Sequence, residues 1–335
     1  MAYTTIDNPE AYFQIALYTG DGAANNAITL PGDTDMQPDL VWIKNRDATD
    51  AHCLFDSVRG ATKLMLVNTS DTETTDTDTL DSFTSDGFQV DADVKVNTSS
   101  EKYVAWCWKE SATAGFDIVG YTGDGSARTI SHSLSAVPRL MIVKSRTYAE
   151  NWNTYNFKSA SDPETDYLEI REIALSDSAT TWNDTAPTSS VFSVGTRDAV
   201  NKNTYTYINY LWRDVQGFSK FGTYEGTNNA NGPFVYTGFS PAFVMVKSID
   251  STDHWRMHDN KRGATAGSAG GTNPAVLYPH LTHAEGAGNN TFDILSNGFK
   301  WRNTDGDANA AQTYVFWAWA AAPFVNSNGA PANAR

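Results

Sequence analysis

Only two cysteines occur among the 335 residues, Cys53 and Cys107, and both lie in the first third of the chain. Small secreted domains without a sufficient core are rich in disulfides, so this class of protein is excluded. Two buried thiols are expected rather than a bridge between them. No apolar run approaches the ~20 residues of a membrane-spanning helix, so no membrane insertion is expected. The first residues also lack the basic and apolar segments of a secretory signal peptide, which predicts folding in a reducing cytoplasm.

Positive charge is also scarce. Lys and Arg number 24 against 39 Asp and Glu, which gives a formal net charge of −15, and the cations form no basic run. Binding to a phosphate backbone needs a cationic stripe, so nucleic acid is not an expected partner. The chain contains 10 Trp, 15 Tyr and 16 Phe, which is enough for packed cores and argues against disorder.

The common catalytic motifs are missing as well. The sequence contains no Gly-x-Ser-x-Gly elbow, no Gly-x-Gly-x-x-Gly loop and no Walker motif. A glycosidase needs two carboxylates a fixed distance apart, and 39 acidic residues do not single out such a pair. We therefore expect a protein that is not an enzyme.

What the chain does contain is a segment written three times, at residues 38–44, 138–144 and 241–247. Each copy opens with proline, continues with apolar residues and ends in lysine, and the final lysines are 100 and 103 residues apart. A proline can open a strand but cannot donate to its ladder, so each copy is predicted to be a strand whose terminal lysine reaches water. A period of this length indicates repeated domains rather than a solenoid of shorter units.

Other segments keep the same period. Tyr18, Tyr121 and Tyr224 are 103 residues apart and close alternating runs that lead into glycine-rich turns. A closing strand with aromatic side chains on one face ends each copy, at residues 103–108, 207–212 and 314–319.

These patterns predict an all-β protein of three tandem antiparallel β-sandwich repeats of about 100 residues, jelly-roll or lectin-like. A sandwich is preferred to a barrel because the closing strands are apolar on both faces, as central strands are. A short helical turn is expected at residues 8–10, where a capping Asn precedes a proline. The predicted organisation is an N-terminal leader 1–11, repeats 12–112, 113–215 and 216–324, and a polar C-terminal tail 325–335.

Two patterns suggest metal ligands. Asp305, Asp307 and Asn309 place oxygen atoms at alternate positions, as calcium loops do, although the glycine and glutamate of an EF-hand are missing. An ordinary hairpin loop is the alternative. Four histidines of the third repeat have spacings that zinc sites sometimes use: His254, His258, His280 and His283.

Two further patterns concern ligand binding. Asp56 with Arg59 and Asp259 with Arg262 recur at the same offset, and the interpretation as ion pairs that pin a turn is preferred to a ligand-binding pair. Four aromatic residues in polar loops could stack on sugar faces, with covering of the sandwich ends as the alternative: Trp152, Trp182, Trp255 and Tyr278.

The triplicated order of Tyr-Thr-Gly-x-Gly, Pro-x-Leu-Val-x-Ile-Lys, Gly-Phe-x-Val and Tyr-Val-Ala-Trp-Cys-Trp resembles a family of virion proteins from tailed bacteriophages, especially marine and cyanobacterial ones. Residues 8–14 and 332–335 are similar to that family too, so the resemblance covers nearly the whole chain. The motifs are strand and turn signatures, and they imply no catalytic residue. The middle repeat departs from the pattern, because it lacks the arginine after its second hairpin strand and the Asn/Asp-Gly turn.

The resemblance implies a non-enzymatic virion structural protein of the tail or tail fibre, which acts in assembly and in adsorption to host-surface glycan. One alternative is a capsid-decorating (cement) protein on the phage head, and another is a tail-associated glycan-cleaving enzyme. The expected location is the virion, after assembly in the host cytoplasm. The expected partners are other virion proteins, host glycan and further copies of the chain, with a trimer as the default because phage fibres are commonly trimeric. No cofactor is expected apart from calcium.

Overall fold

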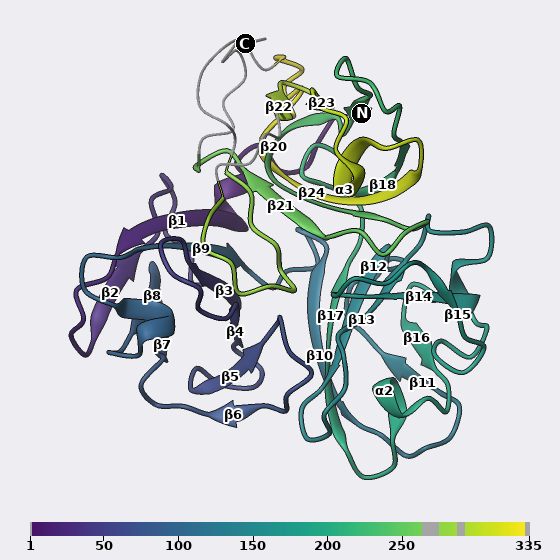
Figure 1. Cartoon of the computed structure of the whole chain (residues 1–335), viewed down its shortest axis with the longest axis horizontal. Coiled ribbons are helices and arrows are strands. Elements are labelled where there is room, and N and C mark those ends of the chain that lie inside the picture. The colour runs from purple at the N-terminus through teal and green to yellow at the C-terminus, as the bar shows by residue number, and fades with distance from the viewer. Residues whose placement is uncertain (1, 263–274, 287–291, 332–335) are drawn as a thin grey trace.

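The computed structural model describes residues 2–262, 275–286 and 292–331, and antiparallel strands dominate it (Figure 1). The predicted all-β class is confirmed. Helix within these residues is limited to short turns: η1 (Pro9–Ala11), α1 (Val94–Asn97), η2 (Pro163–Thr165), α2 (Asp198–Asn201) and α3 (Gly306–Asn309). Asn8 caps η1 by accepting the Glu10 N–H, so the helical turn predicted there is confirmed. No helix of the described residues is long and apolar enough to cross a membrane.

We call residues 12–112, 113–215 and 216–324 units 1, 2 and 3. Unit 1 holds a large sheet in the order β1-β9-β3-β4-β5-β6 and a small sheet in the order β2-β8-β7. Its strands are β1 (Phe13–Thr19), β2 (Asn26–Thr29), β3 (Leu40–Asn45), β4 (Cys53–Asp56), β5 (Lys63–Leu66), β6 (Thr74–Thr75), β7 (Leu80–Thr84), β8 (Gly87–Val90) and β9 (Lys102–Trp108).

Unit 2 repeats the order of the large sheet as β10-β17-β12-β13-β14-β15, and its small sheet pairs β11 with β16. Its strands are β10 (Phe116–Thr122), β11 (Arg128–Ser131), β12 (Leu140–Ser145), β13 (Asn153–Asn156), β14 (Asp166–Glu169), β15 (Ser176–Asp177), β16 (Val191–Val194) and β17 (Thr206–Trp212).

Within its described residues, unit 3 follows the same order with four strands in the large sheet, β18-β24-β20-β21, and three in the small sheet, β19-β23-β22. Its strands are β18 (Ser219–Glu225), β19 (Phe234–Tyr236), β20 (Phe239–Ser248), β21 (Arg256–Asp259), β22 (Phe292–Leu295), β23 (Gly298–Trp301) and β24 (Thr313–Pro323). Pro241 lies inside β20 at a register shift against β24, where a missing N–H donor is tolerated. In units 1 and 2, three sequential strands are neighbours in one sheet, β3-β4-β5 and β12-β13-β14.

The closing strand of unit 1, β9, lies between β1 and β3 and is buried on both faces. Tyr103 and Cys107 point into the core between the two sheets of unit 1. Val104, Trp106 and Trp108 point the other way, into a larger core that also contains side chains of units 2 and 3. The large sheets of units 1 and 2 therefore close their own sandwiches with one face and join the other units with the opposite face, whereas both faces of β24 in unit 3 belong to the larger core. Both cysteines are free and buried, as predicted.

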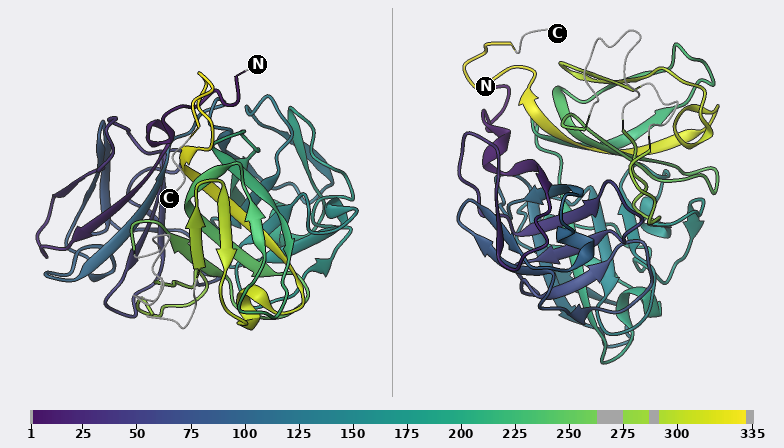
Figure 2. Two further views of the ribbon diagram at one scale, coloured as in Figure 1. Left: turned by 90° about the horizontal axis from the view of Figure 1, so that it is seen from above. Right: turned by 60° about the vertical axis from the view of Figure 1, so that its left-hand side comes forward.

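The three units form a closed ring around this shared core, which Figure 1 shows with unit 1 in purple and blue, unit 2 in teal and unit 3 in green and yellow. The leader and the described part of the polar tail after β24 lie side by side (Figure 2). Asp7 accepts the backbone N–H of Ser327 at 2.6 Å, so this part of the polar tail orders against the leader of its own chain.

The lysines that end the proline-led strands correct the sequence-based expectation of solvent exposure. Lys44, Lys144 and Lys247 are fully buried. Each ammonium donates to backbone carbonyls, as Lys44 does to Asn45 and Ala48 at 2.6 and 2.9 Å. Burial lowers the pKa of each of the three lysines to about 8.

Candidate functional site

The centre of the ring is a triangle of three tryptophans, one from the closing strand of each unit. Trp108, Trp212 and Trp319 meet edge to face, with ring centroids 6.3, 5.4 and 5.7 Å apart. Edge-to-face aromatic pairs are favourable beyond the area that they bury. None of the three indole N–H groups has an oxygen partner among the described residues, and edge-to-face packing offers them neighbouring ring faces as weak acceptors.

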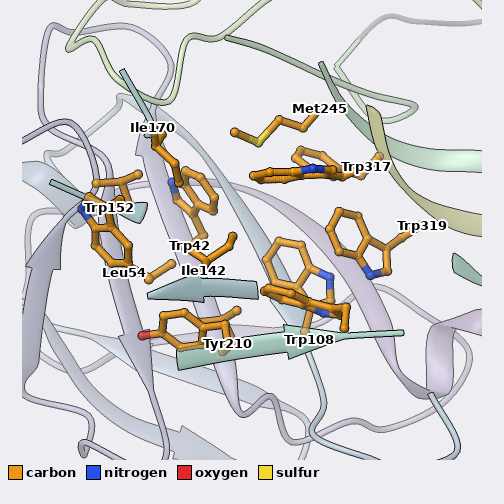
Figure 3. Close-up of a pocket in the computed structure, with 14 residues that line it drawn as sticks. Trp42, Leu54, Trp108, Ile142, Trp152, Ile170, Tyr210, Met245, Trp317 and Trp319 are labelled. Atoms are coloured by element: carbon orange, nitrogen blue, oxygen red, sulfur yellow. The ribbon is translucent and has the colours of Figure 1, made fainter. Parts of the chain in front are cut away.

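A cavity of about 20 Å³ lies beside this triangle, lined by side chains of all three units (Figure 3). Such a volume has room for about one water molecule, and an apolar lining keeps a cavity of this kind dry. Pockets for small-molecule ligands are typically ~300 Å³ or larger. This cavity is therefore a packing defect of the shared core rather than a binding site.

A ring of hydrogen bonds surrounds the core, in which each unit donates from an equivalent position to the unit before it, and unit 1 donates to unit 3. The acceptors are the last residues of β4, β13 and β21, which follow the proline-led strands. The bonds are Trp106 to Asp259 at 3.0 Å, Tyr210 to Asp56 at 2.6 Å and Trp317 to Asn156 at 2.6 Å.

Around the acceptor in unit 1, Asp56 forms a fully buried ion pair with Arg59. Arg59 also contacts Glu73 at 3.3 Å, and Glu73 pairs through both oxygens with Arg146 of unit 2 at 2.9 and 3.0 Å. This network closes the junction between units 1 and 2. The interpretation of Asp56 and Arg59 as an ion pair that pins a turn is confirmed, because Asp56 also accepts the Arg59 backbone N–H.

The junction between units 3 and 1 repeats the network residue for residue. Asp259 pairs with Arg262, and Glu285 contacts Arg262 at 3.1 Å. Glu285 also accepts two hydrogen bonds from the Arg46 guanidinium, both at 2.8 Å. These contacts cross from unit 3 to unit 1. The second predicted ion pair is therefore confirmed as well.

The junction between units 2 and 3 is built differently. Asn156 and Ser159 stand where Asp56 and Arg59 stand in unit 1. Leu175 donates its N–H to the Ile249 carbonyl at 2.8 Å, just as Glu73 does to Arg146, so two apolar side chains replace a charged pair. Both side chains pack on the shared core. The junction between units 2 and 3 therefore lacks both the buried ion pair and the glutamate–arginine pair that the other two junctions contain.

The loop aromatics correct the expectation of exposed sugar-binding rings. Trp152, Trp182 and Trp255 are 2% exposed or less. Their indole N–H groups donate to carbonyls, and those of Trp152 and Trp255 reach the neighbouring unit at Leu66 and Glu169. Stacking of a sugar on these three rings is not supported, because no ring face is free. Tyr278 is partly exposed and contacts His254 edge to face.

The candidate calcium ligands are occupied by partners of the chain itself. Asp305 caps α3, and both Asp305 and Asp307 contact the Arg256 guanidinium at 2.7 Å. The Asn309 side chain is buried and accepts the Thr227 N–H at 2.8 Å. A calcium ion would have to replace the guanidinium, so the oxygens serve a helix cap and an ion pair in this arrangement.

Two of the four candidate zinc ligands come together and two do not. His254 Nδ1 lies 2.9 Å from His280 Nε2, whereas His258 is buried against Phe292. Glu172 of unit 2 joins the first pair, a residue that the spacing of the histidines could not reveal. His283 lies near Tyr278.

The most exposed repeated feature is a loop after the opening strand of each unit, at residues 21–25, 124–127 and 227–231. A buried asparagine supports each loop by accepting a backbone N–H and donating to a carbonyl, and in unit 1 this residue is Asn97. The same contacts come from Asn201 and Asn309 in the other units. The ring therefore presents three equivalent loops on rigid supports.

Fold and junctions together define an all-β protein of two-sheet sandwiches joined by a shared core. The chain belongs to the DUF7483 family, described as a domain of unknown function, whose model matches residues 8–323. No curated protein and no solved structure matches the chain.

Proposed function

We propose that this protein is a non-enzymatic structural component of a tailed-bacteriophage virion, located in the tail or tail fibre, where it acts in assembly and in adsorption to host-surface glycan. The observation that carries the proposal is the closed ring of three units around one aromatic core. Such a block holds its three units in fixed positions through their shared core. The resemblance of its triplicated motifs to phage tail proteins supplies the setting.

Rigidity follows from how the units share their cores. Residues of all three units bury their largest side chains in one cluster, so no unit can swing away without exposing tryptophans to water. Two junctions add ion-pair networks, and the third adds apolar contacts. A part that transmits load or holds a fixed spacing in a particle needs this property.

The three supported loops at residues 21–25, 124–127 and 227–231 are the surfaces that we propose for contacts with partners. Contacts repeated on one rigid body add up to avidity when their geometry allows simultaneous binding. One chain by itself forms a ring of three units, so this ring does not require three chains. A trimer of chains is therefore a separate proposal, which light scattering of the purified protein tests.

Cryo-electron microscopy of the intact particle, with this chain placed in the density, tests the location. Density at the tail or fibre supports the proposal and shows which loops face the host. Density on the head overturns the tail assignment and favours a decorating protein. Absence of the chain from purified particles contradicts both.

Adsorption is tested with the purified full-length chain and the host bacterium. Saturable binding to cells that is competed by extracted surface polysaccharide is expected. Replacement of residues 227–231 by the sequence of 124–127 serves as a matched variant that keeps a loop of the same kind. Release of reducing sugar from the polysaccharide would instead favour the glycan-cleaving alternative.

A further inference from the structure

Three metal-ligating atoms converge at the surface where unit 2 meets unit 3. Glu172 Oε1 lies 2.7 Å from His254 Nδ1 and 3.5 Å from His280 Nε2, and the two nitrogens are 2.9 Å apart. A tetrahedral ion that binds its ligands at ~2.0–2.1 Å holds the ligand atoms roughly 3.3 Å from one another. The three separations bracket this value closely enough for small side-chain rotations to match it.

How these contacts are satisfied without an ion depends on the protonation of the two histidines. A neutral imidazole has one donor and one acceptor nitrogen. If His280 Nε2 donates to His254 Nδ1, the latter has no proton for Glu172 and two lone pairs face each other at 2.7 Å. If both nitrogens donate to Glu172, two N–H groups face each other instead, and only a His254 Nδ1–H shared between Glu172 and an unprotonated His280 Nε2 serves both contacts. A single cation accepts all three lone pairs at once.

The segment that carries Glu172 is held in place on both sides. The Glu169 carbonyl accepts the Trp255 indole N–H at 2.9 Å, and the Leu175 N–H donates to the Ile249 carbonyl at 2.8 Å. His254 is held by its own N–H, which donates to a carboxylate of α3 at 3.1 Å. Ligands on a supported backbone are the arrangement that metal binding requires.

The cluster exists at one junction only, which is the mark of a specific site on a repeated scaffold. Strand register places Ala51 and Asn151 at the positions equivalent to His254. By the same register, Asn68 and Arg171 occupy the positions equivalent to His280 in the other two units. Thr69 and Leu281 occupy the positions equivalent to Glu172. Neither of the other two junctions therefore carries a corresponding pair of histidines.

Neighbouring cations do not rule out a bound ion. Lys247 is the nearest buried ammonium, and Asp253, Asp307 and Glu172 all act on its charge. Arg256 is neutralised by two carboxylates of unit 3. His280 is buried, so its imidazole is shielded from bulk water.

The position also makes structural sense. The junction between units 2 and 3 is the one that lacks the glutamate–arginine pair found at the other two. A metal bridge from unit 2 to unit 3 would supply the missing polar cross-link. We propose that Glu172, His254 and His280 bind one divalent transition-metal ion of the zinc class, which joins units 2 and 3. The fourth position faces solvent and takes a water molecule, because Glu172 and His254 are 46% and 38% exposed.

Isothermal titration of the chelator-treated full-length chain with Zn²⁺ tests the proposal. One ion per chain is expected, with a rise in the melting temperature of a few degrees. Substitution Glu172→Gln or His254→Asn should weaken binding by at least about tenfold, the factor that loss even of an outer-shell partner can cost. Both residues are partly exposed, so the variants are expected to fold as the wild type does.

The matched control is His132→Asn, which removes a partly exposed histidine of unit 2 whose ring nitrogens contact the Thr188 carbonyl and accept the Leu134 N–H. This variant should bind Zn²⁺ as the wild type does. Visible absorption of bound Co²⁺ gives a second readout, present in the control and absent from His254→Asn. Equal affinity in wild type, Glu172→Gln and His254→Asn would overturn the proposal, as would the absence of one-to-one binding.

Discussion

The buried ion pair of unit 1 offers a sharp test, because unit 2 contains the uncharged version of the same contact. The Asp56 carboxylate accepts hydrogen bonds from the Arg59 guanidinium, the Arg59 backbone N–H and the Tyr210 hydroxyl. Both charged side chains are fully buried. In Asp56→Asn, the new amide keeps one acceptor but turns an N–H₂ group toward donors. Only Glu73 then remains to balance the Arg59 charge.

Removal of one partner of a buried ion pair costs ~3–5 kcal/mol, because the other charge stays buried without compensation. We expect this loss of unfolding free energy for Asp56→Asn and a similar loss for Arg59→Ser. The double variant recreates Asn156 and Ser159 of unit 2 and removes both charges together. It should be no less stable than either single variant, which makes the coupling free energy at least ~3 kcal/mol.

Urea unfolding followed by tryptophan fluorescence and by far-ultraviolet circular dichroism measures these differences. The shared core predicts that both signals change together in one transition, and unchanged slopes would show that the variants unfold by the same process. Asn156→Asp is the reverse control, since it buries a carboxylate with no arginine beside it. If the double variant loses the sum of the two single losses within ~0.5 kcal/mol, the two residues are independent and the reasoning fails.

Three other outcomes are expected. Gly123→Ala should destabilise the fold, because a Cβ there would lie 2.2 Å from a backbone oxygen. Gly120→Ala should be tolerated, because the nearest atom to its Cβ would be 3.8 Å away. Equal urea midpoints for the two variants would contradict this. Trp106→Phe should lower the free energy of unfolding by about 1 kcal/mol more than Trp317→Phe does, because the first variant loses a hydrogen bond to a carboxylate and the second a hydrogen bond to an amide. An equal loss in the two variants would contradict this reasoning. Folding lowers the pKa of Lys144 from 10.5 to about 8, so between these pH values the unfolded state binds more protons than the folded state. The free energy of unfolding should therefore rise with pH across that window. Lys144→Met should flatten the rise, and identical pH profiles of wild type and variant would refute the assignment.

Local chemistry explains what the sequence predicted correctly. Alternation in the closing strands predicted one aromatic face per repeat, and Trp106 and Trp108 do share a face. The offset of Asp56 and Arg59 predicted a pinned turn, and the spacing lies within a single hairpin. Interactions of this kind depend on residues a few positions apart, so a single chain segment contains all the information that they need.

Long-range contacts explain the errors. A lysine at the end of a strand normally reaches water, but in the folded chain the carbonyls of the following turn surround Lys44. Trp152 and Trp255 read as exposed loop residues, yet each donates to the unit before it in the chain. A pattern within one repeat cannot show which surfaces another repeat will cover.

The sequence by itself determined that the chain is all-β, triplicated and built from strands with two apolar faces. Only the tertiary structure decided that one of those faces belongs to the repeat and the other to a core shared by three units. It also decided that Glu172 lies beside His254 and His280, about 80 and 110 residues further along the chain. The physical reason is that strand periodicity assigns side chains to faces, whereas the partner of a face depends on how whole sheets pack together.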